Sequence, residues 1–207
     1  MTVEACLAPP EMVDVAFDLA APCLPPDYEW PLYRALARVA PWIESVHAVG
    51  VHPLRATQSA DGSWLLARRA KLVVRLPRDR VCAASILEGA TLDLGAGVAV
   101  ALGHGILRTL EAAPTVYSPR VATGDDDEAA FAAHVREELE ALGIRRPIVC
   151  GKRSRVILDG GSATAFGLAV HGLGDAASLL LQRAGIGRGR AIGCGIFVPH
   201  KTIVAAE

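Results

Sequence analysis

The sequence predicts an α+β fold built from two tandem ferredoxin-like modules. The chain has 207 residues, of which 52% are hydrophobic and 21% are charged, so it can bury a sizeable core. Strand-like and helix-like segments follow one another in the order β-α-β-β-α-β, and this order occurs twice. No sequence identity links the two halves, so the predicted repeat is one of topology.

The first half begins with residues 12–20, which alternate apolar and polar side chains as a half-buried strand does. A helix is expected from about Tyr28, with Pro31 in its first turn, where proline is tolerated. The remaining expected elements of this half are a strand pair over residues 46–54 and 65–77, a short helix over 80–88 and a strand or hairpin over 91–102.

The second half begins with extended segments within residues 107–122. An acidic cluster at residues 125–128 predicts a helix N-terminus, because exposed backbone N–H groups there favour negative charge, and Gly143 ends this helix. The other expected elements are strands over residues 147–150, 155–158 and 164–170, a helix over 176–184 and a last strand over 192–198. The predicted modules are residues 1–104 and 105–207.

Charge and cysteine content narrow the functional classes. The net charge is −1, yet residues 65–90 and 145–207 are basic and the remainder is acidic, so folding could gather one basic surface for RNA. Ordinary mixed surface charge is the alternative. Five cysteines without a CxxC pair indicate neither a zinc site nor a disulfide framework, and we expect no metal or cofactor. No signal peptide or membrane span is evident, which predicts a cytoplasmic protein without a membrane partner.

The most specific segment is AGIGRGRAIGCGIFVPHK, residues 184–201. Its glycines allow the backbone to approach a ligand closely, and Arg188 and Arg190 offer guanidinium groups that suit phosphate. A Rossmann loop would run from strand to helix, whereas this segment runs from helix to strand, and the Gly-Lys-Ser/Thr of a P-loop is absent. A helix C-cap followed by a tight turn remains the structural alternative.

Six segments together resemble a known family. They are VDVAFDLA (13–20), GVHPL (50–54), ARRAKLVVRLP (67–77), PTVYSPRV (114–121), CGKR (150–153) and GCGIFVPHK (193–201). The chain resembles the CRISPR-associated repeat-processing endoribonucleases of the RAMP superfamily, the sixth numbered Cas family, and especially its MYXAN-type subgroup. The resemblance implies a tandem ferredoxin-like fold and metal-independent cleavage within each repeat of the CRISPR precursor RNA.

The resemblance also points to a catalytic histidine near the end of the first helix. Within the family this residue usually comes from that helix or from the segment after it, and His52 in GVHPL fits the pattern better than His47. We expect His52 to be the general base and keep His47 as the second candidate. Arg69 could stabilise the phosphorane, and Tyr33 could donate a proton or stack on a base. Their structural alternatives are phosphate positioning and a place at the edge of the core.

A larger set is expected to bind RNA. Its members are basic side chains of the two basic blocks and residues of the glycine-rich segment. They are Arg68, Lys71, Lys152, Arg153, Arg155, Gly187, Arg188, Gly189, Arg190, His200 and Lys201. A solvated, charged strand edge is the alternative for Lys152, Arg153 and Arg155.

Two other functions remain open from the sequence. One is an RNA-binding scaffold subunit of a CRISPR effector complex, which would keep the basic blocks without needing His52. The other is a small-molecule enzyme with Cys194 or Cys150 as its nucleophile. The expected partners of the main hypothesis are CRISPR repeat RNA, the mature guide RNA and other Cas proteins of a Cascade-like effector.

Overall fold

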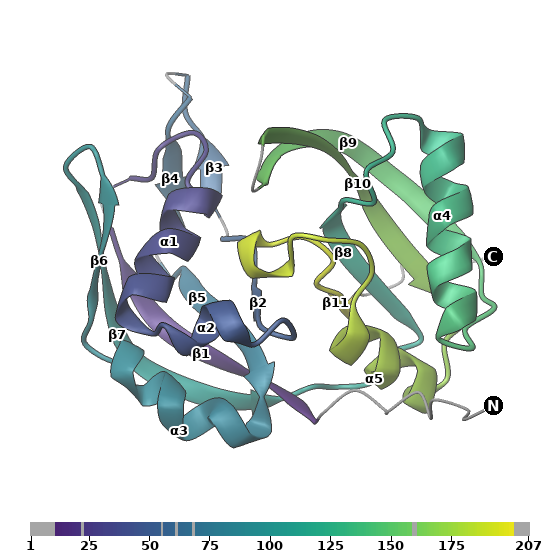
Figure 1. Ribbon diagram of the computed structural model, residues 1–207, viewed down its shortest axis with the longest axis horizontal. Helices are drawn as coiled ribbons and strands as arrows, with labels where there is room; N and C mark the ends of the chain where they lie inside the picture. Colours follow the sequence, from purple (N-terminus) through teal and green to yellow (C-terminus); the bar gives the residue numbers. More distant parts are fainter. Residues whose placement is uncertain are drawn as a thin grey trace, which may run out of the picture.

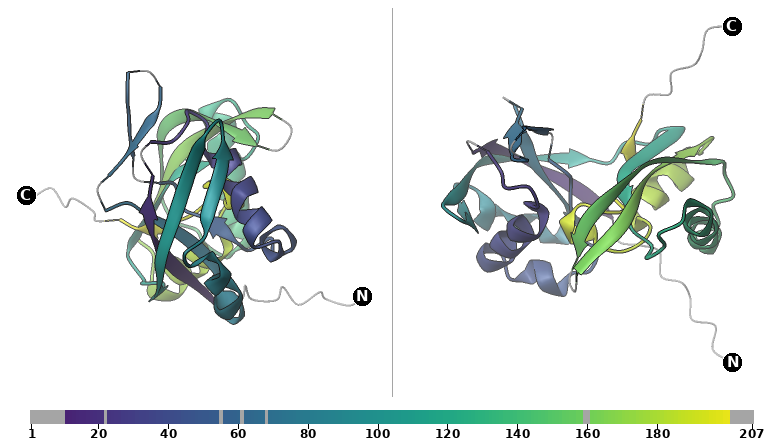
Figure 2. Two further views of the ribbon diagram at one scale, coloured as in Figure 1. Left: turned by 90° about the vertical axis from the view of Figure 1, so that its left-hand side faces the viewer. Right: turned by 90° about the horizontal axis from the view of Figure 1, so that it is seen from above.

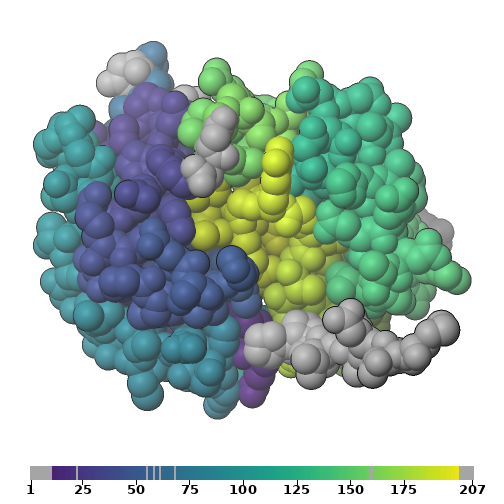
Figure 3. Space-filling model, viewed as in Figure 1, coloured from purple at the N-terminus to yellow at the C-terminus, as the bar shows by residue number. Residues whose placement is uncertain are grey.

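The computed structural model describes residues 11–21, 23–54, 56–60, 62–67, 69–158 and 161–200. The chain forms two α+β modules that lie side by side, and the segment after the last helix runs between them (Figures 1 and 2). Part of this segment, coloured yellow, remains visible between the modules in Figure 3. Element order and sheet topology confirm the predicted tandem of ferredoxin-like modules.

The first module is built on a five-stranded antiparallel sheet with the strand order β2-β5-β1-β7-β6, and β3 and β4 form a separate hairpin. Its elements are β1 (Met12–Ala20), α1 (Glu29–Val39), α2 (Trp42–Ser45), β2 (Gly50–Val51), β3 (Ala56–Gln58), β4 (Trp64–Leu66), β5 (Lys71–Pro77), the 3-10 turn η1 (Arg78–Arg80), α3 (Val81–Ala84), the 3-10 turn η2 (Ser85–Leu87), β6 (Thr91–Gly95) and β7 (Val98–Thr109).

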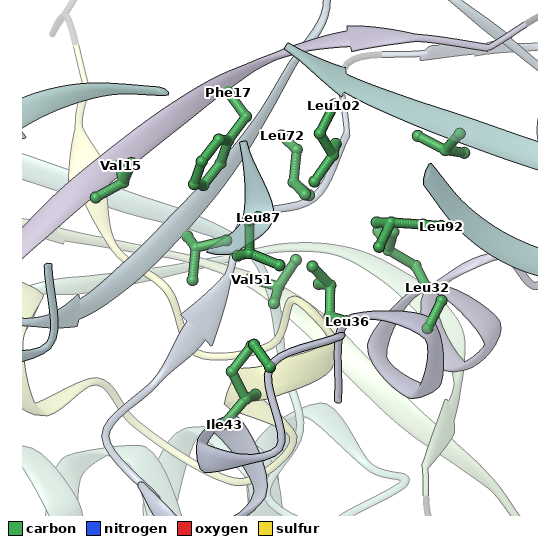
Figure 4. Packing of buried hydrophobic residues seen from close by; sticks show 14 of the residues in the cluster. Val15, Phe17, Leu32, Leu36, Ile43, Val51, Leu72, Leu87, Leu92 and Leu102 are labelled. Atoms are coloured by element: carbon green, nitrogen blue, oxygen red, sulfur yellow. The ribbon is translucent and has the colours of Figure 1, made fainter. Parts of the chain in front are cut away.

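The core of this module lies between the sheet and its helices. Val15 and Phe17 project from β1 toward Leu36 of α1 and Leu87 of η2 (Figure 4). The intervening β1 residues face the other side of the sheet, as the period of two requires. Gly105 of β7 is needed here, because an added Cβ atom would lie 2.8 Å from Cε1 of Phe17.

The second module has a four-stranded antiparallel sheet with the order β11-β8-β10-β9. Its elements are β8 (Thr115–Val121), α4 (Glu128–Ala141), β9 (Ile148–Leu158), β10 (Gly161–His171), α5 (Asp175–Ala184), the 3-10 turn η3 (Arg190–Ile192) and β11 (Val198–Pro199). Asp127 caps α4 by accepting hydrogen bonds from the amides of Ala129 and Ala130 at 2.9 and 3.0 Å. Phe131 of α4 packs against Phe166 of β10, with ring centroids 4.7 Å apart.

Several expected strands differ in length from those observed. The two strands expected within residues 147–158 are one strand, β9, whose register against β10 shifts between Phe166 and Leu168. The strand expected over residues 192–198 is wrong for most of its length, since only Val198 and Pro199 pair. Gly193 and Gly195 have φ angles of +92° and +64°, which a strand does not accommodate.

In the first module, the strand expected over residues 46–54 is reduced to Gly50 and Val51. The segment before it forms the helical turn α2, which brings Ile43 into the core. The predicted boundary at residues 104 and 105 stays a prediction. The strand that carries both residues, β7, continues to Thr109, which pairs with Val13 of β1. Among the described residues, no helix is both long and apolar enough to cross a membrane.

The buried guanidinium group of Arg75 joins the two modules. The side chain of Arg75 on β5 is 1% exposed and donates to both carboxylate oxygens of Asp14 on β1, at 2.7 and 2.9 Å. Its Nη1 donates to the backbone oxygens of Gln182 and Phe197 in the second module, at 3.1 and 2.7 Å. One guanidinium group therefore bonds Asp14 of the first sheet and two backbone oxygens of the second module, one on α5 and one just before β11.

Candidate active site

A cleft of about 660 Å³ opens where the two modules meet. Its wall on the first module comes from α1 and the segment that follows it, and its opposite wall comes from the β9–β10 hairpin. The glycine-rich segment between α5 and β11 forms the third side, and Figure 3 shows this yellow segment between purple α1 and the green strands. The lining residues used below are Trp30, Tyr33, Glu44, His47, Leu158, Ser162, Ala163, Gly187, Arg188, Gly189 and Arg190.

His47 is the histidine that lines this cleft among the described residues. It is exposed and lies in a turn after α2, which the hydrogen bond from the Val49 amide to the Val46 oxygen closes at 3.0 Å. Tyr33, the sequence-predicted proton donor or stacking residue, lines the same cleft. The structure thus brings together two predicted catalytic residues and the glycine-rich segment.

His52 lies elsewhere, on the side of the first sheet that faces the second module. Its side chain is 14% exposed, and Nε2 is 3.4 Å from Oδ1 of Asp14, the carboxylate that also binds Arg75. Burial lowers the pKa of His52 and outweighs the nearby carboxylate. Burial alone would raise the pKa of Asp14, but the two hydrogen bonds from Arg75 and the nearby imidazole of His52 hold this pKa well below its usual range. His52 is therefore a neutral member of a buried ionic cluster at neutral pH.

The glycine-rich segment packs tightly against the second module. A Cβ atom on Gly187 would lie 2.5 Å from the Ala122 oxygen, and one on Gly195 would lie 2.2 Å from the Ile186 oxygen. Many of its amides already have acceptors: the Gly187 amide donates to Oε2 of Glu138 and the Arg188 amide to the Ala122 oxygen, both at 2.9 Å. These glycines thus allow close packing of the backbone. The sequence alone did not distinguish this role from phosphate binding.

The two arginines of this segment have different surroundings. Arg188 is exposed at the cleft. Arg190 turns inward, where its Nε donates to the Ala48 oxygen and its Nη2 to the Gln182 oxygen, each at 3.1 Å. Burial lowers the pKa of Arg190 to about 10, which leaves it charged at neutral pH. Arg190 therefore ties the residue after His47 to the C-terminal end of α5, and Arg188 has the more open guanidinium group.

The basic residues of β9 continue the cleft along the hairpin. A second hollow contains Arg153 and Arg155 and shares Ser162 and Ala163 with the first. Arg155 donates from Nε to Oγ of Ser162 at 2.6 Å, and Arg153 lies 3.9 Å from Asp126. Both side chains and that of Lys152 are exposed.

Other predicted residues lie away from the cleft or outside the described part of the chain. Lys71 forms an ion pair with Asp18, and Arg69 is exposed; neither lines the cleft. His200 lies against the ring of Tyr117, with centroids 5.3 Å apart. Arg68 and Lys201 lie outside the described residues.

Trp30 and Glu44 line the cleft and were not predicted. The signal for Trp30 was its spacing, since it stands three residues before Tyr33 and shares that face of α1. Glu44 stands three residues before His47, on the separate helical turn α2, which follows the end of α1 at Val39.

The thiol alternative finds little support in the geometry. Cys194 is fully buried, and burial raises its pKa to about 11. Burial also raises the pKa of Cys150. A nucleophilic cysteine needs a lowered pKa and access to its substrate.

One family model and one known protein each match most of the chain. The family model described as Cas6 Crispr matches residues 13–202. The "CRISPR-associated endonuclease Cas6" of Myxococcus xanthus (strain DK1622) is 33% identical over 188 residues, which are 90% of this chain and 81% of that protein.

Two solved structures share the fold at low sequence identity. A Cas6-related protein from Pyrococcus furiosus has a TM-score of 0.66 and 15% identity, and the match covers 90% of this chain and 97% of that chain. A structure titled "An RAMP protein binding different RNA substrates" has a TM-score of 0.66 and 13% identity, with coverage of 91% and 100%. Because the family model and the Myxococcus relative both match most of its length, this chain belongs to the Cas6 family.

Proposed function

We propose that the protein is an endoribonuclease that cleaves CRISPR repeat RNA without a metal ion, with His47 as the general base. The observation that carries this proposal is the cleft in which His47, Tyr33 and Arg188 meet across the two modules. Family membership and the name of the Myxococcus relative support the substrate class. His52, the residue favoured by the sequence, is a weaker candidate because it lies in the buried cluster with Asp14 and Arg75.

The chemistry needs only the substrate and side chains of this chain. His47 takes the proton from a ribose 2′-hydroxyl, and the freed oxygen forms a bond to the adjacent phosphorus. The bond from phosphorus to the 5′-oxygen breaks, and that oxygen receives a proton, for which Tyr33 is our candidate donor. The guanidinium group of Arg188 stabilises the negative charge of the phosphorane. The products are a 2′,3′-cyclic phosphate and a 5′-hydroxyl.

The other residues predicted to bind RNA form a path for the RNA that continues from the cleft. Arg153 and Arg155 continue the cleft along the β9–β10 hairpin, and Lys152 lies on the same strand. We propose that these side chains bind backbone phosphates and so position the RNA without reading its sequence. Arg69 is a less favoured catalytic residue than Arg188, because it does not line the cleft.

The test is cleavage of repeat RNA in EDTA by the wild type and by three histidine variants. We expect His47→Ala to slow cleavage by about 100-fold or more, as loss of a general base does, while RNA binding persists. His134→Ala is the matched control, since His134 lies on α4 and pairs with Asp125 at 3.1 Å, away from the cleft.

His52→Ala separates the two candidate bases. If His52→Ala abolishes cleavage in a folded protein while His47→Ala cleaves normally, the assignment of His47 is wrong. If the wild type binds repeat RNA tightly but leaves it intact, the protein is instead an RNA-binding scaffold subunit. A requirement for added metal would contradict the proposed metal-independent mechanism but not the proposal that the protein is an endoribonuclease.

A further inference from the structure

An aromatic pair forms part of the cleft wall next to the proposed catalytic residues. Trp30 and Tyr33 lie on one face of α1, with ring centroids 5.5 Å apart and an interplanar angle of 42°. Both line the cleft that also contains His47 and Arg188. Tyr33 packs partly against the core of its own module. Trp30 is partly buried and contributes its indole ring to the wall of the cleft.

The three tryptophans of the chain lie in different surroundings. Trp42 and Trp64 pack against the hydrophobic core of the first module, and Trp64 also donates from Nε1 to the Pro26 oxygen at 2.8 Å. The indole of Trp30 instead lines an open cleft, where packing against the hydrophobic core buries little of its apolar surface. A large aromatic surface in such a cleft commonly marks a binding site.

The opposite wall suits a flat ligand. Leu158 and Ala163 of the β9–β10 hairpin line the cleft and offer apolar contacts, and Gly187 and Gly189 add no side chains of their own to the intervening side. Arg188 supplies a positive charge on that side. A space with an aromatic wall, an apolar wall and one guanidinium group matches a nucleobase joined to a phosphate.

We propose that Trp30 stacks on an unpaired nucleobase next to the scissile phosphate, so that the cleft contains a base-binding subsite beside the reacting groups. The position of this base relative to the scissile phosphate rests on the proposed function. The stacking itself does not, because single-stranded RNA binding can be measured without cleavage. Through this contact, Trp30 acts as a positioning residue for the nucleotide that His47 would deprotonate.

The first experiment measures binding of fluorescently labelled 12-nucleotide oligo(A) and oligo(U) by anisotropy. We expect Trp30→Leu to weaken oligo(A) binding by roughly 5- to 100-fold, the range that loss of one base–aromatic stack produces. Trp30→Phe keeps an aromatic ring and should stay within about threefold of the wild type. Trp64→Leu is the matched control and should bind as the wild type does, provided that thermal unfolding shows each variant to be folded.

The second experiment is a double-mutant cycle on repeat RNA that carries a 2′-deoxy substitution at the cleavage site, which binds but cannot react. Each nucleotide beside that site is replaced in turn by an abasic residue. At one position the abasic change should weaken binding to the wild type but add little to the loss caused by Trp30→Leu, because the two changes remove the same contact.

The outcomes separate this proposal from the proposed function. Trp30→Leu binding within twofold of the wild type, additive losses at every abasic position, or no binding of any oligonucleotide by the wild type would each overturn the base-binding subsite. If the wild type fails to cleave but the oligo(A) result holds, the nuclease proposal fails while the stacking role of Trp30 stands.

Discussion

Arg190 illustrates how far the role of a single residue depends on its surroundings. The sequence placed it beside Arg188 in a loop expected to bind phosphate. In the structure two glycines make room for it: a Cβ atom on Gly185 would lie 2.1 Å from Nη1 of Arg190, and one on Gly50 would lie 3.1 Å from its Cγ. These glycines come from different modules, so the packing around Arg190 holds the modules together next to His47.

We predict that Arg190→Met lowers the free energy of unfolding by about 2–4 kcal/mol, because the backbone oxygens of Ala48 and Gln182 lose a charged donor. Arg188→Met is the matched control. It should leave stability within about 0.5 kcal/mol of the wild type, as surface substitutions do, while weakening RNA binding. Urea unfolding followed by circular dichroism measures the free energy of unfolding of both variants. Equal stabilities for the two variants would contradict the anchoring role of Arg190.

His52 makes stability depend on pH in a defined direction. Its pKa is lowered in the folded protein, so the unfolded chain binds a proton more readily and acid favours unfolding. We expect the free energy of unfolding to fall as pH drops below the ordinary histidine pKa of about 6.5. His52→Gln should reduce this loss between pH 8 and pH 5 in urea titrations. An unchanged pH slope would show that His52 does not titrate in this way.

At the scale of elements, the conformation of the glycine-rich segment depends on backbone angles that favour glycine. Gly195 has a φ angle of +64°, and an added Cβ atom would meet the Ile186 oxygen at 2.2 Å. Gly143, at the end of α4, has a similar φ angle of +73° but has no atom within 4 Å of the position of an added Cβ among the described residues. The two positions share a conformation and differ in crowding.

This pair makes a matched test of crowding. Gly143→Ala should cost about 1 kcal/mol from conformation alone, and Gly195→Ala about 2 kcal/mol or more beyond that. Gly195→Ala should also slow RNA cleavage, since the segment carries Arg188 into the cleft. Thermal unfolding gives the comparison, and equal melting temperatures for the two variants would rule out the crowding argument.

For the whole molecule, Arg75 is one of the polar links between the modules, because it pairs with Asp14 in the first module and donates to backbone oxygens in the second. Removing one partner leaves a buried charge without compensation, so Arg75→Met should cost about 3–5 kcal/mol. The double variant Arg75→Met/Asp14→Leu should recover part of this loss, because it removes both charges. Calorimetry should show whether Arg75→Met splits unfolding into two transitions. A double variant less stable than Arg75→Met would contradict this account.

The fold was largely predictable because its signals are local. The alternation in β1, the acidic start of α4 and the glycine that ends it each depend on residues close together in the chain. The short strands were harder to predict: Gly50–Val51 and Val198–Pro199 are held by pairing with β5 and β8, partners that lie far away in sequence.

The candidate site was predictable in part. The sequence singled out His47, Tyr33 and the glycine-rich segment, and these meet in one cleft. It ranked His52 above His47 and treated Arg188 and Arg190 alike, because neither the Asp14–Arg75 cluster nor the burial of Arg190 leaves a local signal.

The sequence by itself determined the two β-α-β-β-α-β modules and the segments from which a site could be made, since hydrophobic period and turn residues act over a few neighbours. Only the tertiary structure decided which histidine faces the cleft and which arginine is anchored inside. Those choices depend on what surrounds each side chain: Asp14 and Arg75, which are distant in sequence, lie beside His52, and the backbone of Ala48 in the first module accepts a hydrogen bond from Arg190.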